Sequence, residues 1–181
     1  MFVGNSNSTA TNRTVTESEQ NSRFREWYEN HRGIIVKISK SFTNTIQDQQ
    51  DLIQEISVQL WKSVPSFRDK CKESTWIYRV ALNTAIAWSR KEKRQKNKER
   101  NFADDAFIFS QQENPENKRL DWLFEQLRKL DVVDRSLLLL HLEGQSYSEI
   151  AGILGTTEKN VGVKLSRLRK KLSQTATRDG I

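Results

Sequence analysis

The sequence is poor in the residues on which several fold classes depend. Its 181 residues include one cysteine, two prolines and seven glycines. A single cysteine excludes an internal disulfide framework and a zinc site built from several thiolates, and it favours a reducing, cytoplasmic compartment. So few chain-breaking residues argue against an all-β sandwich, which needs many turns. No stretch approaches the roughly 20 consecutive apolar residues of a membrane-spanning helix.

Signatures of catalysis and of metal binding are also missing. The two histidines, His31 and His141, stand alone, without the spacing of a metal-binding pair. No glycine-rich phosphate loop is present, and the adjacent Asp104 and Asp105 lie in a polar stretch where they serve solubility or charge mimicry better than acid–base chemistry. Cys71 is best interpreted as a lone loop thiol. The sequence therefore predicts a protein that is not an enzyme and takes no cofactor, no metal and no small-molecule substrate.

Charge is distributed in blocks along the chain. Residues 1–22 carry a net charge of −1, residues 23–100 of +8, residues 101–117 of −4, and residues 118–181 of +4. Two basic blocks around an acidic one indicate two modules that bind a polyanion. We expect no secretory signal in residues 1–20, which are rich in Ser, Thr and Asn. The predicted organisation is a disordered tail (1–22), a helical domain (23–100), a flexible acidic linker (101–117), a second helical domain (118–173) and a short tail (174–181).

The first basic block has helical periodicity. Apolar residues from Phe24 recur at helical spacing and continue beyond Gly33, on the same helix or on a second one. Asp51 is expected to begin the next helix, which Pro65 ends or closely follows. Thr75 is expected to cap a helix over 76–92. No stretch has the alternation of a strand, so the sequence predicts an all-α fold.

The helix over 76–92 combines aromatic and basic side chains. Arg79 and Asn83 lie four residues apart, on one helix face, and are candidates for contact with unstacked bases. Trp76 and Trp88 are separated by twelve residues, which returns to the same face, so we expect them to pack in the core.

The second basic block predicts a helix-turn-helix. Asp134 is expected to cap one helix, which ends near Gly144. Ser146 and Glu149 form a capping box for a short second helix that stops at Gly155, and Thr157 caps the last one. The polar face of this last helix carries Lys159, Asn160, Lys164, Arg167, Lys170 and Lys171. A solvated basic helix would share this pattern, but the order of caps, glycine turn and basic helix favours DNA binding in the major groove.

Three segments, in order, resemble the extracytoplasmic-function (ECF, group 4) sigma factors of bacterial RNA polymerase. DLIQEISVQLW (51–61) resembles the polymerase-binding helix of that family. STWIYRVALNTAIAWSRKEKR (74–94) resembles the part that melts and reads the minus-10 element, and residues 142–172 resemble the helix-turn-helix that reads the minus-35 element. The resemblance implies a transcription initiation factor whose partners are core RNA polymerase, through its largest-subunit clamp helices and its flap, and promoter DNA, with a membrane anti-sigma factor as a further candidate.

The resemblance also implies roles for individual residues. Polymerase binding would fall to Asp51, Gln54 and Glu55. Minus-10 DNA would be contacted by Phe67, Lys70, Lys72, Arg79, Asn83 and Arg90, with residues 67–75 forming a loop that captures a flipped base. Minus-35 DNA would be contacted by Thr157, Lys159, Asn160, Lys164, Arg167 and Lys171. Residues 102–112 would thread toward the active centre of the polymerase.

Two other classes of protein remain open at this point. A stand-alone helix-turn-helix regulator would bind an operator tightly without polymerase. A nucleic-acid enzyme, such as a recombinase fragment, would need a clustered acidic or nucleophilic site, which the sequence does not offer.

Overall fold

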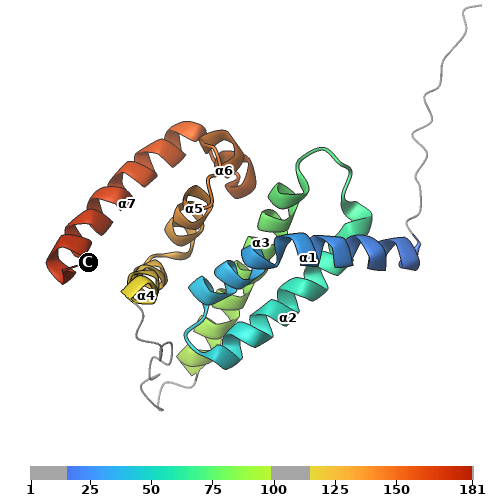
Figure 1. The fold of residues 1–181 in the computed structure, drawn as a ribbon, viewed down its shortest axis with the longest axis horizontal. Helices are drawn as coiled ribbons and strands as arrows, with labels where there is room; N and C mark the ends of the chain where they lie inside the picture. The colour runs from blue at the N-terminus through green and yellow to red at the C-terminus, as the bar shows by residue number, and fades with distance from the viewer. Residues whose placement is uncertain (1–15, 99–114, 181) are drawn as a thin grey trace, which may run out of the picture.

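The computed structural model describes residues 16–98 and 115–180, and within these ranges it contains helices and no strand (Figure 1). The predicted all-α fold is confirmed. The helices are α1 (Glu17–Phe42), α2 (Ile46–Ser63), the short 3-10 helix η1 (Val64–Ser66), α3 (Glu73–Lys98), α4 (Pro115–Lys129), α5 (Val132–Leu142), α6 (Tyr147–Leu154) and α7 (Glu158–Asp179).

The N-terminal half is a bundle of three long helices. α1, α2 and α3 each contact the other two along their lengths, and their shared interior is filled by Trp27, Ile35, Ile38, Leu52, Ile56, Leu60, Ile77 and Leu82, each at most 2% exposed. Leu52, Ile56 and Leu60 recur every four residues, so one face of α2 is buried. Burial of each such side chain stabilises the fold by about 2 kcal/mol. The opposite face of α2 is left to solvent.

The C-terminal half is smaller and built around α5. α7 packs on α5 and α6, and α4 contacts both α5 and α1. The core residues are Phe124, Leu127, Leu137, Leu140, Ile150, Val161 and Leu165, all below 9% exposure. Figure 1 shows α7 at the outer edge of this half, with α5 between it and the N-terminal bundle.

Several predicted boundaries were wrong. α2 begins at Ile46 rather than Asp51, because the Thr45 hydroxyl accepts from the backbone N–H of Asp48 and caps the helix five residues earlier. α3 begins at Glu73, which leaves Thr75 inside the helix and 9% exposed. α5 is capped by Asp131, whose carboxylate accepts from the N–H groups of Val133 and Asp134, and not by Asp134.

The predicted tails are partly helical. α1 begins at Glu17, where Thr16 and Glu19 form a capping box, so residues 17–22 are ordered helix rather than disordered tail. α7 continues to Asp179, six residues beyond the predicted domain end. The apolar residues on either side of Gly33 belong to one helix, α1. This helix is kinked at His31, which has non-helical backbone angles (φ −124°, ψ 16°). The predicted linker lies mostly outside the described residues, and its last three residues begin α4.

The search for membrane spans and metal clusters covers the described ranges only. No helix there is both long and apolar enough to cross a bilayer. No group of three or more His, Cys, Asp and Glu side chains there could hold a metal ion.

Candidate nucleic-acid and partner interfaces

The outward face of α2 carries the residues expected to bind polymerase. Gln54 and Glu55 are exposed and Asp51 is half-buried. Gln47 Nε2 donates to Asp51 Oδ1 at 3.2 Å, and Gln59 Nε2 donates to Glu55 Oε1 at 2.9 Å. Since residues three and four apart share one helix face, the structure brings the three predicted side chains onto a single stripe beside solvent.

Val58 extends this stripe and was missed from the sequence. It lies seven residues after Asp51, on the same face, and its side chain is 45% exposed. An exposed aliphatic side chain among polar ones is typical of protein interfaces, where a small apolar centre is bordered by charge. The spacing 51, 54, 55, 58 was available in the sequence, but Val58 was not separated there from the buried apolar residues of α2.

The segment 67–72, here called the minus-10 loop, links η1 to α3. Lys70 and Lys72 are exposed, as the predicted DNA contacts require. Phe67 is not: it is 7% exposed and its ring meets the edge of Trp27, with centroids 5.3 Å apart. The interpretation of Phe67 as a DNA contact does not fit this structure, because its ring belongs to the core and anchors the start of the loop.

Arg23 of α1 contacts the minus-10 loop and was not singled out from the sequence. Its guanidinium donates to Asp69 Oδ1 at 2.9 Å and to Glu73 Oε1 at 3.3 Å. It also lies 5.0 Å from the ring centroid of Phe67. Asp69 has a left-handed backbone (φ 53°), the only positive φ at a non-glycine residue among those described. No local pattern reveals these contacts, because the partners lie 46 and 50 residues apart in the chain.

The outward side of α3 carries the remaining minus-10 candidates. Arg79, Asn83 and Arg90 follow one another at intervals of four and seven residues and so share a face. Asn83 and Arg90 are exposed, whereas Arg79 is half-buried. Trp76 and Trp88 are partly buried against the core, as predicted.

A groove of about 430 Å³ runs between α2 and α3. Its lining includes Glu55 and Gln59 from α2, and Asn83, Trp88 and Lys91 from α3. The predicted polymerase-binding stripe and the predicted minus-10 stripe therefore meet along one groove, so ligands bound to the two stripes would lie next to each other.

The helix-turn-helix forms through the local signals that predicted it. The Ser146 hydroxyl accepts from the Glu149 N–H, and the Glu149 carboxylate accepts from the Ser146 N–H. The bonds that the Glu149 carboxylate accepts from the Ser146 N–H and from Lys72 hold the pKa of Glu149 at about 2, below its ordinary value. Gly155 ends α6 with a left-handed backbone (φ 65°), and the Thr157 hydroxyl accepts from the Asn160 N–H at the start of α7.

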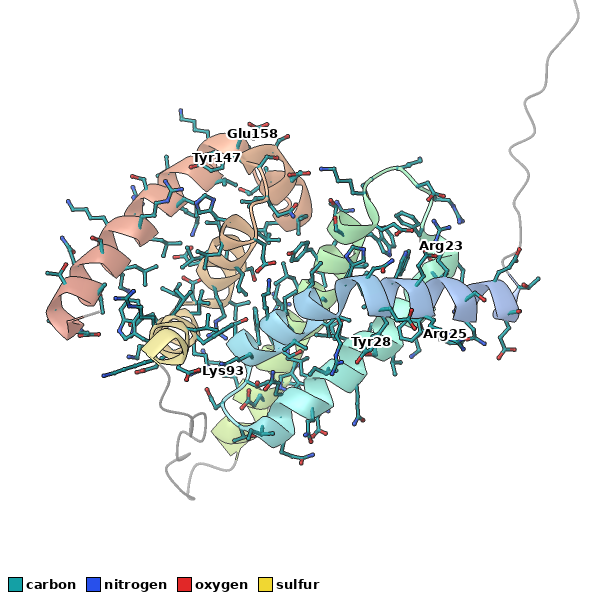
Figure 2. All side chains as sticks on the ribbon, in the orientation of Figure 1. Arg23, Arg25, Tyr28, Lys93, Tyr147 and Glu158 are labelled. Atoms are coloured by element: carbon teal, nitrogen blue, oxygen red, sulfur yellow. The ribbon has the colours of Figure 1, made fainter. Side chains whose placement is uncertain are left out.

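α7 presents its basic residues on the side opposite the core. Val161 and Leu165 are fully buried and Leu168 is 5% exposed. Of the predicted minus-35 residues, five are exposed: Thr157, Lys159, Asn160, Arg167 and Lys171. Figure 2 shows Glu158, at the start of α7, and Tyr147 of α6 together at one end of this half. The turn and the first residues of α7 are therefore accessible, as docking into a groove of duplex DNA requires.

Lys164 differs from the other minus-35 candidates. It lies at the edge of the apolar face of α7, and its ammonium pairs with Asp134 of α5 at 2.5 Å. The other flank of α7 contacts α5 through Arg169 and His141, and the pKa of His141 is lowered by burial and by the positive Arg169. These two contacts fix the rotation of α7 on α5. Lys164 thus has a structural partner that the sequence did not indicate.

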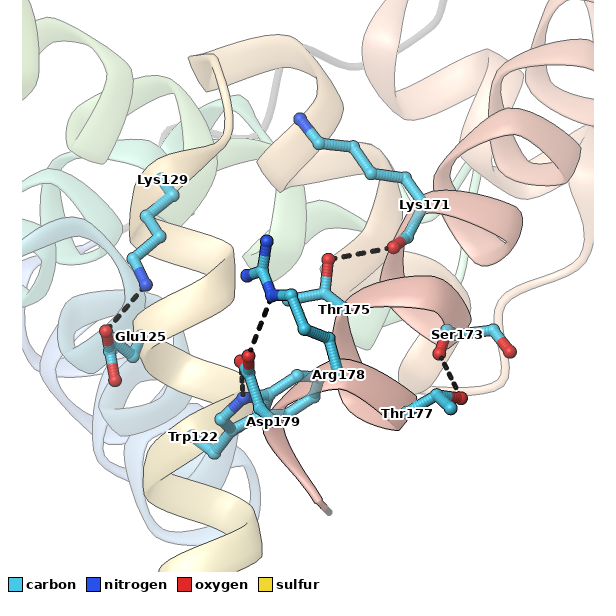
Figure 3. Close-up of polar contacts among 9 residues, drawn as sticks. All are labelled: Trp122, Glu125, Lys129, Lys171, Ser173, Thr175, Thr177, Arg178 and Asp179. Atoms are coloured by element: carbon cyan, nitrogen blue, oxygen red, sulfur yellow. Dashed lines mark hydrogen bonds and ion pairs between the residues drawn. The ribbon is translucent and has the colours of Figure 1, made fainter.

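The far end of α7 is tied to α4 (Figure 3). The indole Nε1 of Trp122 donates to Asp179 Oδ2 at 3.0 Å, and Arg178 Nε donates to Asp179 Oδ1 at 3.2 Å. Both bonds lower the pKa of Asp179, the one from Trp122 more strongly. Because α5 packs nearer the start of α7 and α4 is bonded to its end, neighbouring helices hold α7 along its length.

The two halves contact each other over the surface predicted to bind minus-10 DNA. Lys72 pairs with Glu149 of α6 at 3.0 Å, and Arg79 donates to the backbone carbonyl of Gly152 at 3.1 Å. Beside them, the Tyr78 hydroxyl donates to Glu143 at 2.9 Å, and burial together with this bond raises the pKa of Tyr78. Two predicted minus-10 residues, Lys72 and Arg79, therefore contact the first helix of the helix-turn-helix.

A second contact joins the end of α1 to the C-terminal half. Arg135 is largely buried and donates to the carbonyl of Ser41 at 3.1 Å, while also bonding three carbonyls around the α4–α5 turn. Its guanidinium lies 4.9 Å from the Phe42 ring centroid. Arg128 donates to the carbonyl of Lys40 at 3.2 Å. Two arginines thus satisfy carbonyls that the last turn of α1 leaves without helical partners.

Comparison with known families matches both halves. Residues 27–95 match Sigma-70 region 2, and residues 120–172 match Sigma-70, region 4. Together the two matches cover about two thirds of the chain, in the order that the sequence segments suggested. The first contains α2, the minus-10 loop and most of α3, and the second contains the complete helix-turn-helix.

Individual relatives agree with these matches. The chain is 28% identical over 137 residues to the ECF RNA polymerase sigma-E factor of Haemophilus influenzae, covering 69% of this chain and 72% of the relative. It is 28% identical over 141 residues to RNA polymerase sigma factor YlaC of Bacillus subtilis, covering 75% and 82%.

Solved structures share the fold. The sigma factor RpoE of Bartonella quintana, solved with the anti-sigma factor NepR, superposes with a TM-score of 0.70 at 20% identity, over 84% of this chain and 96% of that one. CnrH, solved with the cytosolic domain of CnrY, gives a TM-score of 0.66 at 23% identity, over 90% and 93%.

Proposed function

Because the chain belongs to the extracytoplasmic-function sigma factors of bacterial RNA polymerase, and is therefore a transcription initiation factor, we propose how its surfaces divide that work. The family is non-enzymatic, so the task of each surface is binding. The observation that carries the proposal is the presence of three stripes of exposed side chains: an acidic and apolar one on α2, a basic one on the minus-10 loop and α3 that α6 contacts in part, and a basic one on α7.

The α2 stripe binds core polymerase in this proposal. Asp51, Gln54 and Glu55 offer carboxylate and amide groups, and Val58 adds an apolar contact. The surface complementary to this stripe would be basic and partly apolar, and we assign it to the clamp helices of the largest subunit. The buried face of α2 holds the stripe in place, since Leu52 and Ile56 are fully buried in the bundle.

The two basic stripes bind the two promoter elements. The α7 stripe enters the major groove at minus-35, where Asn160 and Arg167 can bond base edges and Lys159 and Lys171 can bond phosphates. The minus-10 loop and α3 bind the opened strand through Lys70, Lys72, Asn83 and Arg90. Unstacking a base costs a few kcal/mol, and capture of that base offsets the cost.

Core polymerase allows two DNA contacts that are weak when separate to act together as one strong interaction. Once both halves are fixed on the enzyme, binding of one promoter element raises the effective concentration of the other. Residues 102–112, within the block 101–117 whose net charge is −4, would follow the path that nucleic acid later takes through the polymerase. The proposed place of action is the cytoplasm, where bacterial polymerase and promoters meet.

An anti-sigma factor is the further partner in this proposal. RpoE of Bartonella quintana was solved with such a protein, NepR, and shares this fold. The partner proposed for this chain is a membrane-bound anti-sigma factor. It would compete for the α2 and α7 stripes and thereby keep the chain from polymerase and promoter.

The decisive experiment is run-off transcription from a promoter library, with core polymerase and this protein. We expect transcripts that depend on the protein and share two spaced sequence elements. Glu55→Lys should lower the affinity for core polymerase about tenfold or more. Glu29→Lys makes the same charge change on the exposed side of α1 and serves as the control. Absence of both transcription and polymerase binding would refute the proposal, and equal effects of the two variants would refute the assignment of α2.

A further inference from the structure

We propose that Arg23 is a positioning residue for the minus-10 loop, and that binding of the opened minus-10 strand depends on it although it lies on α1. This inference rests on the proposed function, since it concerns the loop assigned to the opened strand. Arg23 contacts the loop at its start and in its middle, through the Phe67 ring and the Asp69 carboxylate, and it contacts the first residue of α3 through the Glu73 carboxylate. These three contacts leave the loop little freedom relative to α1.

The start of the loop is fixed by aromatic packing. Phe67 lies between Trp27, at a centroid distance of 5.3 Å, and Trp76, at 5.6 Å. The guanidinium of Arg23 lies 5.8 Å from the Trp27 ring centroid as well as near Phe67. A cation beside aromatic rings is attracted by their negative faces. The Trp27 and Phe67 rings therefore hold the Arg23 guanidinium in position independently of its bonds to the carboxylates.

The middle of the loop needs an external anchor. A left-handed backbone is uncommon at non-glycine residues, although aspartate tolerates it better than most. Such a conformation persists when its surroundings impose it. The bond from Arg23 to Asp69 Oδ1 holds the side chain of the residue that has this backbone, and so supplies a constraint from outside the loop.

Charge gives the anchor a second role. The minus-10 loop exposes three cations, Arg68, Lys70 and Lys72, of which Lys72 pairs with Glu149 of α6, and a single anion, Asp69. An uncompensated carboxylate there would repel the phosphates of an approaching strand. Arg23 neutralises Asp69 from the side of α1, so the outward surface of the loop remains positive.

Partial exposure makes the role local rather than global. The side chains of Arg23, Asp69 and Glu73 are 38%, 69% and 34% exposed. Ion pairs at such positions contribute little to the free energy of unfolding. Loss of Arg23 should therefore leave the fold intact while it loosens the loop, and this separates a positioning residue from a residue of the core.

Arg23→Ala is the test variant and Arg25→Ala is its matched control. Arg25 lies two residues further along α1, is exposed, and projects from the opposite side of the helix, as Figure 2 shows. Binding of a minus-10 single strand by the holoenzyme should fall about fivefold for Arg23→Ala, because the partly exposed ion pairs that order the loop are individually weak. Arg25→Ala should stay within about twofold, and both variants should bind core polymerase and minus-35 duplex like the wild type. Arg23→Gln replaces Arg23→Ala if the alanine variant folds poorly.

A second change distinguishes positioning of Asp69 from mere packing. Asp69→Gly adopts the left-handed turn without strain and also removes the carboxylate. The double variant Arg23→Ala/Asp69→Gly should therefore recover most of the lost strand binding. If Arg23 acted only by packing on Trp27 and Phe67, a change at Asp69 would restore nothing.

Hydrogen exchange of the loop amides provides a readout that does not depend on transcription. Arg23→Ala should speed exchange in residues 68–72, and Arg25→Ala should not. Unchanged exchange, strand binding equal to that of Arg25→Ala, or no recovery in the double variant would each overturn the proposal. Failure of the proposed function would look different: the wild-type protein would itself give no promoter-dependent transcript with core polymerase.

Discussion

The two halves of the molecule hold their candidate DNA surfaces in opposite ways. In the C-terminal half, the caps and the turn that define the helix-turn-helix each span a few residues: Ser146 with Glu149, Thr157 with Asn160, and the turn at Gly155. In the N-terminal half, the minus-10 loop is shaped by Arg23, whose partners are 46 and 50 residues distant. A surface fixed by local contacts tolerates change elsewhere in the chain. A surface fixed by remote contacts can be altered from another helix.

The largest expected effect comes from the contact that joins the halves. Arg135→Ala removes bonds to four carbonyls and empties a site between Phe42 and the α4–α5 turn. We expect a loss of about 3 kcal/mol in the free energy of unfolding, measured by urea denaturation. Arg119→Ala, at an exposed position of α4, should change it by less than about 0.5 kcal/mol. Similar losses for Arg135→Ala and Arg119→Ala would show that the bonds made by Arg135 between the two halves do not stabilise the protein.

The next effect tests whether the two DNA surfaces act separately. Arg167→Ala should weaken binding of minus-35 duplex by the holoenzyme by about 1–3 kcal/mol and leave minus-10 strand binding unchanged. Asn83→Ala should do the reverse. Both side chains are exposed, so neither change should affect stability. Electrophoretic mobility or anisotropy measurements with the two isolated elements would decide, and a parallel loss on both elements would contradict the division of work.

Two glycines of the helix-turn-helix provide a sharper local test. Gly155→Ala places a side chain on a left-handed backbone (φ 65°) and should cost about 1–2 kcal/mol. Gly152→Ala lies inside α6 with open space around its Cα, and should stabilise the protein by about 0.5–1 kcal/mol. Thermal denaturation of both variants checks the signs, and destabilisation by both would contradict the structure of this turn.

The smallest effect concerns pH. The pKa of Glu149 is about 2 in the folded protein, below its ordinary value of 4.5, because Ser146 and Lys72 donate to its carboxylate. A lowered folded-state pKa means that the stabilisation is complete above about pH 4.5 and is lost as the pH falls toward 2. Glu149→Gln should therefore reduce the difference in melting temperature between pH 6 and pH 3. An identical pH dependence in both proteins would contradict the assigned bonds.

The same contrast between local and remote contacts explains what could be predicted from the sequence. The capping box at Ser146, the stop at Gly155 and the cap at Thr157 were all predicted and are confirmed, because each depends on neighbouring residues. The residue that caps α5 was harder to predict, because two aspartates lie near the start of that helix. Asp131 precedes α5 and caps it, whereas Asp134 lies in the first turn of α5 and pairs with Lys164, thirty residues away.

The candidate DNA contacts divide along similar lines. Exposure of Lys70, Asn83 and Arg90 followed from helix faces and loop position. The burial of Phe67 did not, because a loop aromatic is buried only when other helices supply the pocket, here Trp27 and Trp76. Arg23 was one basic residue among many until the fold placed Asp69 and Glu73 beside it.

The contact between α6 and the minus-10 surface has one consequence for the affinity of that surface. A strand that draws Lys72 and Arg79 toward its phosphates must compete with Glu149 and the Gly152 carbonyl, which hold the same side chains against α6. The apparent dissociation constant of the isolated protein is then the intrinsic one divided by the fraction of molecules in which the halves have separated. Whatever holds the halves apart therefore raises the affinity for the strand without touching it.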